Sequence, residues 1–414
     1  MKLVNSKRNR GVLDRLANRG ALDLARVERP TAKIVNDVRK HGDSALLRYA
    51  RKFDGFKGKN LRVGQEEVDA AWQQITPDLR HALEIAATNI RRFCEWQRPQ
   101  EWIREVQPGV KLGQLIRPID AVGCYVPGGR HPLPSTLLMT VIPAQIAGVP
   151  RIVVVSPRPA PETLAAAALL GVKEFYAIGG AQAIAALAYG TKSIPKVDKI
   201  VGPGNAFVTT AKKLVAFDCS IDMLAGPTEA LVVAENGNAG FIAADLVAQA
   251  EHDPDALPVF VTSNKKLGEQ VMAETKRQSQ SNRVAREALK RNGYVIVSKS
   301  PAESMRIANL LAPEHITVPD PHALAEVHSA GSVFVGDFSP QAAGDYASGP
   351  NHVLPTGACA RFRGGLSVND FVKLITVQEL SARGLGTIAR EVTTLARAEG
   401  LLAHAQSIAV RMEA

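Results

Sequence analysis

The sequence predicts an α/β protein in which two doubly wound parallel sheets follow one another along the chain. Short apolar strands alternate with helices from about residue 121 to residue 229, and the alternation begins again after Pro227. This order of elements is typical of parallel sheets covered by helices. Helical patterns before residue 105 and in the last fifty residues add an extension at each end. A length of 414 residues agrees with two or three domains.

The first hundred residues carry amphipathic helical spacing. Residues 27–55 place Ile34, Val35 and Val38 on one apolar stripe, and Asp43 is an expected N-cap after a turn. Residues 78–97 form a second long amphipathic segment.

The two α/β series begin after this helical region. The expected strands of the first series are 151–155, 175–179 and 199–202, and those of the second are 230–234, 258–263, 294–298, 315–318 and 332–336. Two such series in tandem predict a cleft between two halves. The C-terminal helices cannot bury their apolar stripe alone, so we expect them to dock elsewhere, for instance on a second subunit.

The composition is that of an ordinary globular protein and excludes several classes. Hydrophobic residues make up 46% and charged residues 22%, which excludes a disordered or fibrous chain. The net charge of +10 permits nucleic-acid binding, but aromatic residues are only 5% and no basic stretch is interleaved with them. We therefore expect no nucleic-acid partner, and an attraction for anionic small molecules.

Three features predict a soluble, cytoplasmic protein. The first twenty residues lack the apolar region of a secretory signal. The longest apolar stretch, 137–155, is interrupted by Pro143, Pro150 and Arg151, so no membrane span is expected. The four cysteines are scattered without a CxxC pair, which indicates a reducing compartment and argues against a thiolate zinc site.

Glycine-rich turns follow several expected strands. No GxGxxG motif is present, but clusters occur at 124–130, 179–184 and 201–208. In the third cluster a strand runs into Gly202-Pro203-Gly204-Asn205 and then a helix, whose free amide groups suit a phosphate. Turn geometry alone explains any one cluster, whereas three in one domain favour a ligand.

Several polar clusters are candidates for chemistry. Gln249 and His252 are spaced to share one helix face, which fits a metal site or a solvated face. Glu314 and His315 enter a strand together, which fits a general base with a proton shuttle or a surface pair. The expected loop 344–357 holds Asp345, Tyr346, Asn351 and His352, and long loops dense in polar side chains often form sites.

Two further candidates lie near the C-terminus. Glu399 and His404 are five residues apart on the expected terminal helix and do not share a face. Gln249, His252, Asp345 and His404 are the nitrogen and oxygen donors that a catalytic zinc site uses. The sequence by itself does not show that these four residues converge.

Nine of these segments resemble the histidinol dehydrogenase family and occur in the family's order. They are CYVPGG, GGAQAIAALAYGT, VDKIVGPGNAFV, AGPTEALVV, DLVAQAEHD, APEH, GDYASGPNHVLPT, TVQELS and EGLLAH. The N-terminal GDSALLRYARKFDG is similar to the family too, so the resemblance covers essentially the whole chain.

The resemblance implies two Rossmann-like doubly wound α/β domains in tandem, with helical N- and C-terminal extensions, in an intertwined homodimer. The implied parts are an N-terminal helical extension (1–20), a catalytic α/β domain (21–120 plus 230–365), an NAD-binding Rossmann-like domain (121–229) and a C-terminal helical dimerisation segment (366–414).

The resemblance also implies a zinc-dependent oxidoreductase of histidine biosynthesis. Such an enzyme oxidises L-histidinol to L-histidine through L-histidinal with two NAD⁺. By similarity, Gln249, His252 and Asp345 would bind one zinc ion per subunit, joined by His404 of the partner subunit. Glu314 and His315 would be catalytic, Tyr125, Gln182 and Asn205 would contact NAD, and Thr228, His352 and Glu399 would complete the substrate pocket with the zinc ligands and His315.

These residue types fit the implied chemistry. Zinc would orient the substrate through its amine and imidazole. His315 would take the hydroxyl proton, and Glu314 would activate water for the second oxidation. Cys124, beside a glycine turn, is the cysteine that could act as a covalent nucleophile, but a buried structural role is the alternative.

One departure from the family pattern bears on the substrate. Thr228 stands where the family usually has serine, so the hydroxyl is kept and the added methyl narrows the pocket. A paralogue that oxidises another polar alcohol, such as a sulfonated propanediol, is the main alternative. His352 and Glu399 favour histidinol, because a carboxylate repels a sulfonate. A basic nucleic-acid-binding protein that only keeps the fold would have lost these site residues, and all are present.

Overall fold

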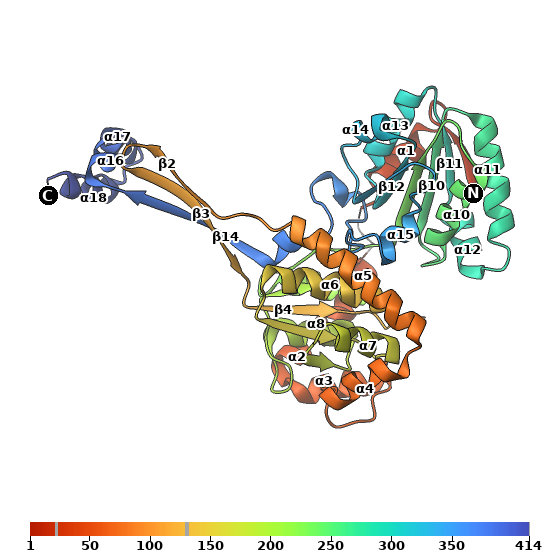
Figure 1. The fold of residues 1–414 in the computed structure, drawn as a ribbon, viewed down its shortest axis with the longest axis horizontal. Helices are drawn as coiled ribbons and strands as arrows, with labels where there is room; N and C mark the ends of the chain where they lie inside the picture. Colours follow the sequence, from red (N-terminus) through yellow and green to blue (C-terminus); the bar gives the residue numbers. More distant parts are fainter. Residues whose placement is uncertain (21–23, 129–131, 414) are drawn as a thin grey trace.

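Three sheets organise the residues that the computed structural model describes, which are 1–20, 24–128 and 132–413. Two of the sheets are parallel and belong to two α/β domains that lie side by side (Figure 1). The third sheet is antiparallel and forms an arm that extends away from both domains. The predicted α/β class with parallel sheets in tandem is therefore confirmed.

The first domain is built on a five-stranded parallel sheet in the order β6-β5-β4-β7-β8. Its strands are β4 (Ala121–Tyr125), β5 (Arg151–Val155), β6 (Glu174–Tyr176), β7 (Lys199–Val201) and β8 (Ser220–Ile221), and its connecting helices are α6 (Pro134–Ala147), α7 (Pro161–Leu169), α8 (Gly180–Tyr189) and α9 (Ala206–Val215). The chain order reverses between β4 and β7, which makes the carboxyl edge there the expected ligand site.

The N-terminal helices also pack on this first domain. They are α2 (Ala25–His41), α3 (Asp43–Asp54), α4 (Gln65–Gln74) and α5 (Pro77–Trp96). Helix α2 contacts α8 and α9, α4 contacts α7, and α5 contacts α6. We expected residues 21–120 to belong to the same domain as residues 230–365, but helices α2 to α5 pack on the first domain instead. The physical reason is that the apolar stripe of α2, with Val35 and Val38, is buried in one core with Ile184 and Leu187 of α8.

The second domain is built on a six-stranded parallel sheet in the order β1-β11-β10-β9-β12-β13. Its strands are β1 (Lys2–Asn5), β9 (Glu229–Val233), β10 (Leu257–Thr262), β11 (Tyr294–Val297), β12 (His315–Val318) and β13 (Ser332–Val335). Its helices are α1 (Arg10–Ala17), α10 (Ala239–Ala250), α11 (Lys265–Gln278), α12 (Arg283–Asn292), α13 (Pro301–Leu311), α14 (Pro321–Ala325) and α15 (Gln341–Tyr346).

The expected helical extension at residues 1–20 instead begins with an edge strand. Strand β1 pairs in parallel with β11, with Lys2 opposite Tyr294, and only then does α1 follow. Val4 is buried in the core of the second domain, which fixes the strand to the sheet. Residues 1–20 are thus an integral part of the second domain.

The arm combines chain segments from both halves of the sequence. Strands β2 (Trp102–Gln107) and β3 (Val110–Pro118) join β14 (Val372–Leu380), and helices α16 (Ala382–Gly386), α17 (Ala389–Ala398) and α18 (Leu402–Met412) cover its tip (Figure 1). The C-terminal segment was expected to be helical throughout, but β14 is a strand because it completes the antiparallel sheet along the whole of β3.

Two short 3₁₀ turns, Cys359–Arg361 and Val368–Phe371, connect the second domain to the arm.

The arm helices bury little of their surface within this chain. Ala396 is the buried residue of α17 and Ala405 that of α18, whereas Leu395 and Leu402 are more than half exposed. Within the described part of the chain, no helix has the length and apolar character needed to cross a membrane.

Candidate active site

A cavity of about 350 Å³ lies where the amino edge of the six-stranded sheet faces the first domain. Strands β9 and β12 are parallel neighbours, with His315 opposite Ala230. The residues at and just before the first positions of the two strands therefore lie close together. Seven of the residues predicted for catalysis, metal binding or the substrate pocket line this cavity, namely Thr228, Gln249, His252, Glu314, His315, Asp345 and His352.

Helices α10 and α15 bring three of the predicted metal-binding residues to one side of the cavity. Gln249 lies in the last turn of α10, and His252 follows in the turn after the helix ends at Ala250. Asp345 lies on α15, in a region that the sequence predicted as loop. The Nε2 of Gln249 donates to Oδ2 of Asp345 at 3.1 Å. Gln249 and Asp345 are buried and His252 is exposed.

Glu314 and His315 lie at the start of β12 and are both buried, with 7% and 2% of their surface exposed. The Oε2 of Glu314 accepts hydrogen bonds from the Thr228 hydroxyl at 2.6 Å and from the backbone N–H of Glu229 at 2.8 Å. The Nε2 of His315 lies 3.4 Å from Oδ1 of Asp345, and its Nδ1 lies 3.6 Å from Oε2 of Glu314. The imidazole is therefore held between two carboxylates.

These contacts control the charge of the cluster. Burial lowers the pKa of His315, but the carboxylates of Glu314 and Asp345 outweigh it and raise the pKa to about 10. Burial raises the pKa of Asp345, but its hydrogen bond and attraction to His315 outweigh that effect and lower it. In the protein without ligands, His315 and Asp345 therefore form a charged pair at neutral pH.

His352 lies beside this pair and, unlike His315, favours the neutral form of its imidazole. Its Nδ1 is 2.8 Å from the carbonyl oxygen of Asp345, and its Nε2 is 3.3 Å from the hydroxyl of Thr136. Burial lowers the pKa of His352, so its imidazole is neutral at neutral pH. Thr136, at the start of α6, is a contact that the sequence reasoning did not single out.

A second cavity, of about 380 Å³, contains the three residues predicted to contact NAD, which are Tyr125, Gln182 and Asn205. It lies at the carboxyl edge of the five-stranded sheet, where the chain order reverses. Pro127 and Asn205 line both cavities, so the two cavities adjoin.

Local hydrogen bonds position the lining of this second cavity. The Tyr125 hydroxyl accepts from the Gly180 N–H at 3.1 Å, and Asn205 caps α9 through its side-chain oxygen. The Nε2 of Gln182 donates to Oδ2 of Asp54 at 3.3 Å. Asp54 lines the cavity although it comes from α3. The sequence did not indicate this role, because the amphipathic pattern of residues 27–55 predicts a helix but not which cavity its last residues reach.

Glu399 and His404 are not brought to either cavity of this chain. Both are exposed and lie on the arm, Glu399 at the end of α17 and His404 on α18 (Figure 1). Among the described residues, no three His, Cys, Asp or Glu side chains are grouped closely enough to hold a metal ion. One chain therefore supplies an incomplete set of the predicted ligands.

Cys124 is excluded from both cavities. Its side chain is fully buried in β4, and burial raises the pKa of its thiol to about 12. A thiol with this pKa is almost entirely protonated at neutral pH and is a poor nucleophile. The structure therefore assigns Cys124 to the core of the first domain.

Comparison with known proteins identifies the family. The family model described as histidinol dehydrogenase matches residues 17–412. The chain belongs to the histidinol dehydrogenase family. The histidinol dehydrogenase of Methanothermobacter thermautotrophicus is 46% identical over 415 residues, which cover 97% of each chain. That of Geobacter sulfurreducens is 44% identical over 401 residues, which cover 94% of each chain.

A solved structure of the family supports the fold. The crystal structure of histidinol dehydrogenase from Elizabethkingia anophelis superimposes with a TM-score of 0.94 at 36% identity, covering 100% of this chain and 98% of that chain. Membership in the histidinol dehydrogenase family confirms the predicted resemblance and the oxidoreductase class, and it implies a small-molecule substrate. The roles of the individual site residues stay predictions.

Proposed function

We propose that the protein is a zinc-dependent histidinol dehydrogenase that oxidises L-histidinol to L-histidine through L-histidinal, with reduction of two NAD⁺. The observation that carries this proposal is the adjoining pair of cavities, one with Tyr125 and Gln182 and the other with Glu314 and His315. A dinucleotide bound in the first cavity reaches a polar substrate in the second across their shared lining. Family membership supports the choice of substrate.

The charge of the second cavity favours a cationic substrate. Its described lining includes the carboxylates of Asp253, Glu314 and Asp345 and contains neither lysine nor arginine. An amine and an imidazole are attracted to such a lining, whereas the sulfonate of the alternative substrate is repelled. The described part of this cavity therefore favours L-histidinol over a sulfonated propanediol.

The residues present fit a zinc ion. Gln249, His252 and Asp345 would hold it, with His404 of the partner subunit, and these are the oxygen and nitrogen donors of catalytic zinc sites. When bound, zinc supplies a fixed positive charge that orients the amine and imidazole of the substrate. A cation held by Asp345 also offsets the negative charge that keeps His315 protonated, which favours the neutral imidazole that a general base requires.

The residues of this chain then perform the proton transfers. In the first oxidation, neutral His315 accepts the proton of the substrate hydroxyl as hydride leaves the carbon that bears this hydroxyl and passes to NAD⁺. In the second, Glu314 accepts a proton from water as the water oxygen attacks the aldehyde carbon, and a second hydride leaves for a second NAD⁺. The Thr228 hydroxyl and the Glu229 N–H hold Oε2 of Glu314 in place for this step.

We propose further that two chains share each site. A cavity of about 790 Å³ adjoins the candidate active site and is lined by parts of α5, α6 and α12 together with His252 and Tyr346. The arm carries exposed apolar side chains, among them Leu395 and Leu402, close in sequence to Glu399 and His404. The arm of a second copy would fill this cavity, bury these side chains and deliver Glu399 and His404.

The first experiment measures NADH formed from L-histidinol, with and without a chelator. The expected result is about two NADH per histidinol consumed, lost with the chelator and restored by zinc. Zinc-loaded, folded protein that does not turn over L-histidinol would contradict the proposal, and turnover of a sulfonated propanediol by the same protein would support the alternative.

The second experiment tests the shared site by mixing two inactive variants. His252→Ala and His404→Ala are unfolded together and refolded as a mixture. In mixed dimers, the His404→Ala protomer keeps its own Gln249, His252 and Asp345 and receives His404 from the other protomer. Random pairing restores about a quarter of the wild-type activity if the site is shared. No recovery from a mixture that contains folded mixed dimers would show that each site belongs to one chain.

A further inference from the structure

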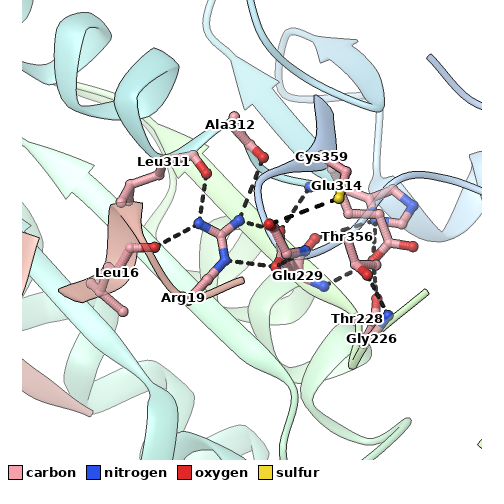
Figure 2. A network of polar contacts seen from close by, with 12 residues as sticks. Leu16, Arg19, Gly226, Thr228, Glu229, Leu311, Ala312, Glu314, Thr356 and Cys359 are labelled. Carbon is pink, nitrogen blue, oxygen red and sulfur yellow. Dashed lines mark hydrogen bonds and ion pairs between the residues drawn. The ribbon is translucent and has the colours of Figure 1, made fainter. Parts of the chain in front are cut away.

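A buried ion pair between Arg19 and Glu229 adjoins Glu314 (Figure 2). Arg19, two residues after α1, binds the carboxylate of Glu229 at the start of β9, and their side chains are only 14% and 6% exposed. The Nε of Arg19 donates to Oε1 of Glu229 at 2.7 Å, and its Nη2 donates to Oε2. This two-pronged contact is the geometry that fixes both planar groups in orientation.

Glu229 connects this ion pair to the predicted catalytic residues. Its Oε2 accepts the backbone N–H of Glu314 at 3.3 Å, and its own backbone N–H donates to Oε2 of Glu314 at 2.8 Å. Its carbonyl oxygen lies 3.3 Å from Nδ1 of His315. One residue thus contacts the main chain and carboxylate of Glu314 and the imidazole of His315.

Arg19 holds the turn that leads into the same two residues. Its remaining donors bind the carbonyl oxygens of Leu16 at 2.8 Å, Leu311 at 2.7 Å and Ala312 at 3.4 Å. All five N–H groups of the guanidinium are thereby used. Ala312 has a φ of 44°, a left-handed conformation that is unfavourable for alanine, and only Pro313 separates it from Glu314. The contacts with Arg19 stabilise this turn.

A second arginine, Arg361, binds the end of α13 without contacting the carboxylate of Glu229. Arg361 donates to the carbonyl oxygens of Leu310 at 2.6 Å and Ala17 at 2.8 Å. It therefore joins the end of α1 to the end of α13, as Arg19 does. Because the Arg361 guanidinium binds these carbonyl oxygens and not Glu229, Arg361 provides a control for a purely structural role.

We propose that Arg19 and Glu229 are positioning residues that fix Glu314 and His315 for the oxidation of the substrate. The inference rests on the function proposed above. Without the guanidinium, the buried carboxylate of Glu229 loses two of its four hydrogen bonds and its counter-charge, so it becomes protonated or moves toward water. Either change breaks its bond to the Glu314 N–H and releases the segment that carries both catalytic groups.

The test compares Arg19→Lys and Glu229→Gln with Arg361→Lys. Lysine keeps the charge of Arg19 but not its five fixed donors, and glutamine keeps the size of Glu229 but replaces one acceptor oxygen with an NH₂ group. We expect both variants to lower kcat by about 10- to 100-fold, since small displacements of catalytic groups have effects of this size. We expect KM for L-histidinol and NAD⁺ to stay within about twofold, because neither residue lines the two cavities.

Deuterium exchange gives a second measurement that does not depend on turnover. The amides of Glu314 and Gly357 both donate to the Glu229 carboxylate. Their peptides are expected to exchange faster in Arg19→Lys and Glu229→Gln than in wild type, and Arg361→Lys should leave the Gly357 peptide unchanged. The exchange is measured on folded protein without substrate.

The outcomes separate this inference from the proposed function. Wild-type protein that is inactive on L-histidinol contradicts the proposed function, whatever the exchange rates. An active wild type with unchanged kcat in both variants overturns the positioning role. The positioning role is also overturned if Arg361→Lys loses as much kcat as Arg19→Lys and Glu229→Gln do. It is overturned as well if both of these variants fail to fold, because Arg19 and Glu229 then act through stability alone.

Discussion

The side-chain amide of Gln249 donates to Asp345 across 3.1 Å and thereby joins α10 to α15. One helical turn earlier on α10, the carboxylate of Asp245 accepts the backbone N–H of Gln341 at the start of α15. Two contacts on one face of α10 therefore hold the short helix α15 at both ends. The orientation of Asp345 is set by α10, the same helix that ends just before His252.

Replacement of Asp245 by asparagine should stabilise the protein at neutral pH. Burial raises the pKa of Asp245 from 3.8 to about 6, so the folded state binds its proton more tightly than the unfolded state. Below about pH 4 both states are protonated and the residue has no effect, whereas wild type loses stability relative to the variant as pH rises through about 6. The expected gain at neutral pH is about 2 kcal/mol.

Urea unfolding of Asp245→Asn and wild type at acidic and neutral pH checks this prediction. Asparagine keeps the size and the acceptor for the Gln341 N–H, so the contact with α15 is preserved. Asp14→Asn, a change at an exposed position of α1, is the control. An equal difference between variant and wild type at both pH values would refute the explanation by burial.

We expect the hydroxyl of Thr228 to contribute more to kcat/KM than its methyl group does. Its Oγ1 lies 2.6 Å from Oε2 of Glu314 and 3.0 Å from Oε1 of Gln249. Thr228→Ser keeps both contacts, and its kcat/KM should stay within about threefold of wild type. Thr228→Val keeps the shape but removes the hydroxyl, and we expect kcat/KM to fall by about 10- to 100-fold. Similar values for the two variants would show that the hydroxyl does not position Glu314.

Removal of His404 should abolish zinc retention without unfolding the chain. His404 is exposed on α18, so alanine creates no cavity in a core. His404→Ala is expected to lose metal on dialysis, as measured by elemental analysis, with an unchanged circular dichroism spectrum. His322→Ala, at an exposed histidine of α14, should keep its zinc. A His404→Ala protein with stoichiometric zinc and full activity would remove His404 from the ligand set.

The buried pair of Lys212 and Asp222 should support the NAD cavity. Lys212 binds Asp222 and donates to the Gly202 carbonyl at 3.0 Å, and Asp222 accepts the Gly202 N–H at 2.7 Å. Lys212→Met leaves a buried carboxylate unpaired, which is expected to cost about 3–5 kcal/mol. Because Gly202 opens the loop that carries Asn205, KM for NAD⁺ should rise as well.

Chemical unfolding and steady-state kinetics measure the two effects of Lys212→Met. The neighbouring Lys213→Met removes an exposed ion pair with Glu28 and should change stability by less than about 1 kcal/mol. The double variant Lys212→Met/Asp222→Asn removes both charges and should recover part of the lost stability. A double variant no more stable than the single one would exclude the unpaired charge as the cause.

The sequence predicted the α/β core well because its signal is local. Strands buried on both faces are continuous apolar runs, as in 151–155 and 230–234, and the structure has strands there. The edge strand β1 and the arm strand β14 were not predicted, because they are short or largely exposed and pair with distant segments. The apolar stripe of α2 indicated that the helix packs, but not against which domain.

The same distinction applies to the candidate site. Seven residues predicted for catalysis, metal binding or the substrate pocket meet in one cavity, and their motifs were visible because each carries a polar side chain near a turn. Arg19 and Glu229 were missed. Their signals were a single arginine after a helix and a single glutamate at the start of an apolar strand, and neither indicates that the two residues pair across the fold.

The pairing of β1 with β11 has a consequence for the order in which the chain folds during synthesis. Lys2 leaves the ribosome long before its partner Tyr294 has been made. The helices from α2 to α5 and the five-stranded sheet are complete by Ile221, so the first domain has most of its elements while the second has only β1 and α1. Closure of the six-stranded sheet is therefore a late, long-range event, in which the first strand of the chain pairs with a partner made almost three hundred residues later.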